Sequence, residues 1–324
     1  MSFQSDIRLQ RNVLLVGLVL LLVKVYTFYI TSSNAVLSDA LESLVNIVSG
    51  TFALVSLKIA SRPSDKNHPY GHGKVEFISG FIEGTLIIIA GLMMIGKATY
   101  NIIVLNEVKE LMLGILLTSI TGFVNFAMGF KLKKQGQKKG SMIMISEGSH
   151  LMSDGYTSLA LIIGIAVVWI SGFVVLDSII SILFGVYVLY MGYKIFRKSI
   201  AGIMDEMDMD LVDEFIEELN KERKPDWIDV HNLRIIKFGR DVHIDCHLTL
   251  PCYYSLEKSH EQVELFEKVI QRKFEPYTEF FIHADSCIKP SCKLCTLKSC
   301  EERKHPFEQK VIWDVNNVLA NAKH

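Results

Sequence analysis

Charged residues are scarce in this chain of 324 residues. Only 21% of the residues are Asp, Glu, Lys or Arg, whereas 50% are hydrophobic and the mean hydropathy is +0.29. So little charge excludes an ordinary soluble domain of this length. The formal net charge is −1, without a basic stripe, and this excludes nucleic acid as a partner.

Three further features are missing. No cysteine precedes Cys246, so the redox state of all six depends on which side of a membrane the last part of the chain faces. The first apolar run, which follows Arg8 and Arg11, has no small-residue cleavage site, and we interpret it as a retained helix. The His-Glu-x-x-His motif of helical zinc proteases is absent, which argues against a metalloenzyme and for a protein that is not an enzyme.

Apolar residues are concentrated in segments of about 20 residues or more, the length that crosses a hydrocarbon core of about 30 Å. Lysine and arginine gather in the connections after the second and fourth segments and behind the sixth, while the other connections hold only Lys109. The positive-inside rule then places both termini in the cytoplasm, where cysteines are reduced. We expect a multi-pass protein of the lipid bilayer with helices at roughly 12–31, 36–60, 76–100, 108–130, 144–171 and 175–195.

Polar groups inside these segments form two matched pairs. Glu42 and Asn46 lie in the second segment, and His150 and Asp154 lie in the fifth. Each pair is four residues apart and therefore shares a helix face. Such groups are costly in a bilayer and are functional candidates. Together they can close a tetrahedral Zn²⁺ site, and the oxygen-rich set leaves Mn²⁺, Fe²⁺ and Co²⁺ open. The alternative is a buried polar network that ties the helices together.

Small residues surround these positions, and we expect them to let neighbouring helices approach closely. They are Ser43, Ser49, Gly50, Gly148, Ser149, Ser153 and Gly155.

A second group of ligand types follows the second segment, in the stretch Ser-Asp-Lys-Asn-His-Pro-Tyr-Gly-His-Gly-Lys-Val-Glu. Asp65, His68 and His72 make a plausible three-ligand set with an open position. The alternative is that the glycines and proline shape a tight turn and the histidines are surface groups.

The pattern changes after about residue 204. Residues 211–221 are amphipathic, 230–238 and 241–250 alternate, 255–273 are helical, and 279–283 alternate again. This order predicts a small α+β domain. We therefore expect three parts, namely a six-helix transmembrane domain at 1–203, a cytoplasmic domain at 204–288 and a cysteine-containing extension at 289–324.

The tail from Cys287 onward carries the spacing C-x4-C-x2-C-x4-C. In a reducing compartment such clustering suggests metal binding by thiolates. A small structural site, a regulatory sensor and a set of unpaired cysteines all remain open. The four residues are Cys287, Cys292, Cys295 and Cys300, and a terminal helix is expected around 311–320.

At the paired positions of the second and fifth segments, the sequence resembles the cation diffusion facilitator family of zinc and related metal transporters. The resemblance runs from the first helix to about residue 288. Family members carry two ligand pairs at this spacing on helices two and five, where this chain has Glu42, Asn46, His150 and Asp154. Helix two usually carries aspartate, or histidine with aspartate, and Glu42 with Asn46 departs from that pattern.

The resemblance implies further sites. Asp65, His68 and His72 fall where some members bind a second metal in the loop. The C-terminal domain resembles the metallochaperone-like ferredoxin fold that dimerises family members. Family metal ligands of the cytoplasmic domain fall on His231, His247, His260, His283 and Asp285, and His243 shares a strand face with His247 and could substitute for it.

These observations predict an efflux transporter of divalent metal ions, with Zn²⁺ first and Mn²⁺, Fe²⁺, Co²⁺ and Cd²⁺ as further candidates. It would exchange metal for protons by alternating access, as a homodimer in a cell membrane such as the bacterial inner membrane. His150 can couple metal transport to proton transport, because the metal ion and the proton compete for the same nitrogen. Cytoplasmic metal would also act as a regulator. The alternatives are a membrane-anchored metal sensor and a channel without proton coupling.

Overall fold

The computed structural model describes residues 3–31, 34–104, 111–171, 175–239, 241–274 and 278–323. Lys109 and the expected connection around it lie outside these residues. The chain forms two compact units, Met1–Met204 and Asp205–His324.

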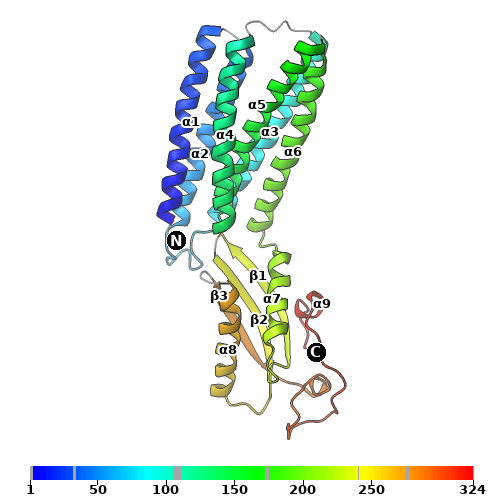
Figure 1. Ribbon diagram of the computed structural model, residues 1–324. Helices are drawn as coiled ribbons and strands as arrows, with labels where there is room; N and C mark the ends of the chain where they lie inside the picture. The colour runs from blue at the N-terminus through cyan, green and yellow to red at the C-terminus, as the bar shows by residue number, and fades with distance from the viewer. Residues whose placement is uncertain are drawn as a thin grey trace. The chain divides into compact units, whose positions relative to one another are not determined.

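The first unit consists of long helices that lie side by side (Figure 1). Within the described residues, all six apolar segments are helical, as expected, and several helices run beyond the apolar part because a helix satisfies its own backbone hydrogen bonds in lipid and in water. Judged by length and apolar composition alone, the described residues contain two candidate membrane spans, Asp6–Tyr26 and Val75–Tyr100. A count of six spans therefore stays a prediction. The helices are α1 (Phe3–Thr31), α2 (Asn34–Ala60), α3 (Val75–Val104), α4 (Leu111–Lys139), α5 (Met142–Ser171) and α6 (Val175–Ile203).

These helices associate most extensively as three pairs, α1 with α2, α3 with α6, and α4 with α5. Glycines allow the last pair to approach closely. A Cβ atom added at Gly148 of α5 would lie 2.5 Å from the backbone nitrogen of Lys133 and 2.8 Å from the carbonyl oxygen of Gly129, both on α4. At Gly155 the added atom would lie 2.7 Å from Cβ of Phe126. The expected close approach at Gly148 and Gly155 is confirmed.

Replacing Gly148 by alanine is expected to destabilise the α4–α5 pair. The new methyl group would meet backbone atoms, which no side-chain rotation can move away, and overpacking of this kind costs about 1–3 kcal/mol. Gly96→Ala in α3 is the matched control, because nothing lies within 4 Å of a Cβ atom there and alanine favours helix. Thermal unfolding in detergent measures both variants. Equal midpoints for the two variants would contradict the close packing.

The second unit has the element order helix, strand, strand, helix, strand that the sequence predicts. Strand β1 pairs antiparallel with β2, and β2 pairs parallel with β3 after the crossover through α8, so the sheet order is β1-β2-β3. The elements are α7 (Met209–Glu222), β1 (Asp229–Phe238), β2 (Asp241–Leu250), α8 (Leu256–Phe274) and β3 (Thr278–Ser286).

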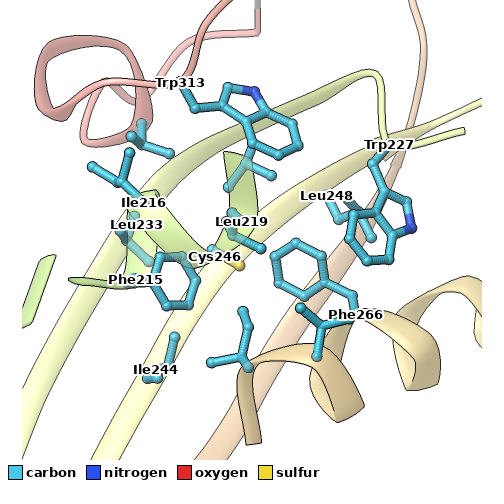
Figure 2. Close-up of a cluster of buried hydrophobic side chains, with 14 of the residues drawn as sticks. Phe215, Ile216, Leu219, Trp227, Leu233, Ile244, Cys246, Leu248, Phe266 and Trp313 are labelled. Atoms are coloured by element: carbon cyan, nitrogen blue, oxygen red, sulfur yellow. The ribbon is translucent and has the colours of Figure 1, made fainter. Parts of the chain in front are cut away.

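Helices α7 and α8 pack against one face of this sheet. Figure 2 shows Phe215 of α7 and Phe266 of α8 against Ile244, Cys246 and Leu248 of β2. Successive strand residues point to opposite faces, so the residues between these three in β2 belong to the other face. Cys246 lies in the core. Its burial raises the pKa of the thiol, so Cys246 is not a reactive cysteine.

The residues after β3 fold back onto the same core. They begin with the 3₁₀ helix η1 (Lys289–Lys293) and end with α9 (Val315–Val318). The terminal helix is shorter than the expected 311–320, because Asp314 caps its start by accepting a hydrogen bond from the Asn317 backbone amide at 2.9 Å. Trp313 is buried in the core and lies 3.9 Å from the Arg223 guanidinium.

Candidate metal sites

Three helices of the first unit bring polar side chains to one buried position. Asn46 of α2 donates a hydrogen bond from Nδ2 to Oδ2 of Asp154 on α5. One turn earlier on α5, His150 has Nε2 at 3.9 Å from Oδ1 of Asp154. The side chain of the fourth expected ligand, Glu42, lies outside the described residues. The predicted pairing of α2 with α5 is thus present for the three ligands that the structure describes.

Glu83 of α3 completes this arrangement, and sequence reasoning missed it. Its carboxylate is fully buried and accepts hydrogen bonds from Ser49 Oγ at 2.5 Å and from His150 Nδ1 at 3.0 Å. The signal was available, since Glu83 is an ionisable residue inside an apolar segment. Another carboxylate, Glu147 of α5, is also buried, and its Oε1 would lie 3.1 Å from a Cβ atom added at Gly50 of α2.

The arrangement suits a cation. A carboxylate that accepts from Nδ1 fixes the imidazole tautomer and leaves Nε2 of His150 with a free lone pair. The 3.9 Å from that nitrogen to Asp154 is too long for a hydrogen bond but close to the separation of about 3.3 Å between two ligands of one tetrahedral zinc ion. Oδ1 of Asn46 is buried without a hydrogen-bond partner among the described residues, so it is available as a further oxygen ligand.

The loop between α2 and α3 gathers Asp65, His68 and His72 as the sequence predicts. Oxygen atoms of Asp65 lie 3.1 Å from His68 Nδ1 and 3.5 Å from His72 Nε2. Three ligand atoms, one from each residue, lie within 4.8 Å of one another. The His68 backbone amide donates to Asp65 at 2.8 Å and holds the pKa of that carboxyl below its usual value. The loop therefore presents a charged three-ligand set.

A second compact set lies on the sheet face opposite the helices. His231, His247 and His283 are direct neighbours across β1, β2 and β3. Asp285 reaches all three, at 3.4 Å from His231 Nε2, 3.0 Å from His247 Nδ1 and 3.4 Å from His283 Nε2. Ligand atoms of His231, His247 and Asp285 lie within 4.8 Å of one another. One carboxylate thus joins three imidazoles.

The carboxylate of this second set is paired with a lysine, because Lys323 Nζ lies 3.1 Å from Oδ1 of Asp285. Burial lowers the pKa of His231 and keeps its ring neutral, as a metal ligand must be. Burial opposes ionisation of Asp285, but hydrogen bonds from Lys323 and His247 outweigh it and lower the pKa of Asp285. Asn232 also donates toward His247 Nε2 at 3.2 Å. Sequence reasoning missed both Asn232 and Lys323.

Two expected histidines do not join this set. His260 is exposed on α8 and pairs with Glu264 at 3.5 Å. His243 shares the strand face of His247, as expected, but lies opposite Glu279 and contacts that residue at 3.0 Å. Residues four apart on a strand are about 13 Å apart, so His243 cannot take the place of His247 in this structure.

The four cysteines of the tail, Cys287, Cys292, Cys295 and Cys300, line one pocket together with Cys252. Burial raises the pKa of Cys287 to about 11 and that of Cys295 above its usual value. Without a metal these two residues are therefore mainly protonated at neutral pH.

Comparison with known proteins assigns both units. The sequence model of the cation efflux transmembrane domain matches residues 12–204, and that of the cytoplasmic domain of cation efflux proteins matches residues 207–287. The first match alone covers more than half of the chain. The protein is therefore a membrane protein with a cytoplasmic C-terminal domain, from a family of transporters and not of enzymes.

Similar full-length proteins agree with this assignment. An uncharacterized transporter of Synechocystis is 28% identical over 250 residues, covering 77% of this chain and 81% of that protein. The cation-efflux pump FieF of Citrobacter koseri is 25% identical over 271 residues, covering 83% and 88%. Metal tolerance protein C1 of Arabidopsis thaliana is 25% identical over 309 residues, covering 87% and 64%. The chain belongs to the cation diffusion facilitator family of cation efflux transporters.

Proposed function

We propose that this protein exports a divalent metal ion, Zn²⁺ first, in exchange for protons. The observation that carries the proposal is the buried set on α2, α3 and α5, in which Glu83 holds Nδ1 of His150 and Nε2 faces Asp154. Nitrogen and oxygen ligands suit a borderline ion, and Asn46 in place of a carboxylate keeps Mn²⁺, Fe²⁺, Co²⁺ and Cd²⁺ as further substrates.

Proton coupling follows from the same atoms. Metal binds the neutral imidazole, so an ion at Nε2 of His150 excludes a proton there, and a proton excludes the ion. Asp154 faces that nitrogen, so its carboxylate would partly neutralise the positive charge of either the metal ion or the proton. A site that opens alternately to the two sides would then load metal from the cytoplasm, where proton concentration is low. It would release the ion on the acidic side.

The rest of the chain serves this exchange. We expect six spans with both termini in the cytoplasm, in a cell membrane such as the bacterial inner membrane. The cytoplasmic units of two copies would associate as a homodimer. An ion held by His231, His247 and Asp285 would favour whichever conformation binds it better, and thereby regulate transport. Asp65, His68 and His72 would hold a further ion.

Uptake into proteoliposomes tests the function. With an acidic lumen, Zn²⁺ uptake is expected to rise, because protons leave as metal enters, and a protonophore should remove the stimulation. The same vesicles compare Mn²⁺, Fe²⁺, Co²⁺ and Cd²⁺. Failure of every ion to move would contradict transport. Flux that ignores the pH gradient would contradict exchange and point to a channel.

A further inference from the structure

The cysteine pocket lies partly beyond the two matched domains. The cytoplasmic-domain match ends at residue 287, whereas three of the five lining cysteines, Cys292, Cys295 and Cys300, follow that residue. The other two come from the ends of neighbouring strands, Cys252 after β2 and Cys287 after β3. All five are free thiols. The fold thus gathers five sulfurs from three separate segments.

Backbone amides already point at two of these sulfurs. The parallel register pairs Leu250 with Ser286 and brings the two strand ends together. There the Cys252 amide donates to Cys287 Sγ at 3.3 Å, and the Cys287 amide donates to the Leu250 carbonyl at 2.9 Å. The Lys304 amide lies 3.5 Å from Cys292 Sγ. Amide hydrogen bonds to sulfur stabilise a thiolate in metal–thiolate sites.

Arg303 shapes the loop that carries the remaining cysteines. Its guanidinium donates to the carbonyl oxygens of Cys292 at 2.7 Å, Cys295 at 2.9 Å and Leu297 at 2.7 Å. A fixed positive charge therefore lies beside the pocket. Four thiolates around a divalent ion carry a net charge of about −2, which Arg303 partly offsets.

Besides these hydrogen bonds and an ion pair between Lys293 and Glu308 at 3.0 Å, the segment buries few side chains. From Cys287 to Ile312, only Ser291 and Cys295 are buried. Long segments without regular structure or a core usually need a disulfide or a metal, and disulfides do not persist in the cytoplasm. A metal is the remaining cross-link.

We propose that four of these five cysteines bind one Zn²⁺-like ion as thiolates, at a site separate from the transported ion. Sulfur ligands select zinc, cadmium and Cu(I), while excluding the harder Mn²⁺. Each thiol that binds gives up its proton to water, and no electron is transferred. Among the described residues, the groups of three ligand atoms that all lie within 4.8 Å of one another are the loop set and the sheet set. No three of the described pocket sulfurs lie that close together, so side-chain rotation would bring them onto the ion.

Cobalt is the probe that separates this site from the others. Co²⁺ is added to the full-length protein, purified in detergent under reducing conditions. A sulfur-to-cobalt charge-transfer band is expected in the near ultraviolet, and the nitrogen and oxygen sites cannot produce one. The band should disappear in the Cys292→Ser, Cys295→Ser double variant, which should also bind one Zn²⁺ fewer. Cys246→Ala is the matched control because Cys246 lies in the core. Absence of the band from the unaltered protein, or its persistence in the double variant, overturns the proposal.

A second measurement needs no variant. Alkylation of the zinc-loaded protein, mapped by peptide mass, is expected to spare the pocket cysteines until a chelator is added. Equal labelling with and without zinc would overturn the proposal, as would disulfides between these cysteines in freshly isolated protein.

Discussion

Asp154→Ala is expected to reduce proton-driven metal uptake by a factor of about 30 or more, because removing one partner from a buried charged set costs about 2–5 kcal/mol and each 1.4 kcal/mol is tenfold. The substitution removes the oxygen that faces His150 and the acceptor of the Asn46 amide. Uptake is measured in proteoliposomes with an acidic lumen.

The control for this prediction is Asp213→Ala, which removes an exposed carboxylate from α7. It should transport at the unaltered rate. Both proteins must elute as single peaks in detergent, so that loss of uptake reflects the site and not the fold. Unchanged uptake by Asp154→Ala would show that the buried set on α2 and α5 does not carry the ion.

Glu83→Gln is expected to weaken metal affinity in the uptake assay by about 10- to 100-fold, the usual effect of losing the group that orients a histidine ligand. The amide keeps the size of the side chain but can donate to Nδ1 of His150. An imidazole that accepts a hydrogen bond at Nδ1 carries its proton on Nε2, the nitrogen that faces Asp154. The proton then occupies the position where the metal would bind.

A double-mutant cycle identifies how Glu83 acts. In a His150→Ala background, Glu83→Gln should have little further effect, because its contribution passes through the imidazole. Additive losses would show that Glu83 acts independently of His150, as a ligand or as part of the packing. Half-maximal metal concentrations and maximal rates are measured separately, since a positioning role changes affinity first.

The sequence predicts contacts within helices better than contacts between them. His150 and Asp154 were found because residues four apart share a helix face. Glu83 has no partner at that spacing, and only the tertiary packing brings it to His150. For the same reason, exposure of His260 could not be known before the packing of α8.

The sheet site shows a second limit. Alternation predicts that His231 and His247 each lie on one strand face, but their pairing depends on register, which shifts between His231 and Arg234. Asn232 adopts a positive φ of 53° at that irregularity. Likewise, Cys252 is distant in sequence from the extension and reaches its cysteines only through the parallel pairing of β2 with β3.

The pairing of the transmembrane helices bears on how the ion is released. Asn46, Glu83 and His150 belong to different tight helix pairs, since α2 packs on α1, α3 on α6 and α5 on α4. A metal ion tolerates ligand distances only within about 0.2 Å, while packed pairs move as rigid bodies. If the ion is held by Asn46 and His150 as proposed, a small slide of one pair against another would break the coordination shell, so that opening of the bundle and loss of the ion would occur together.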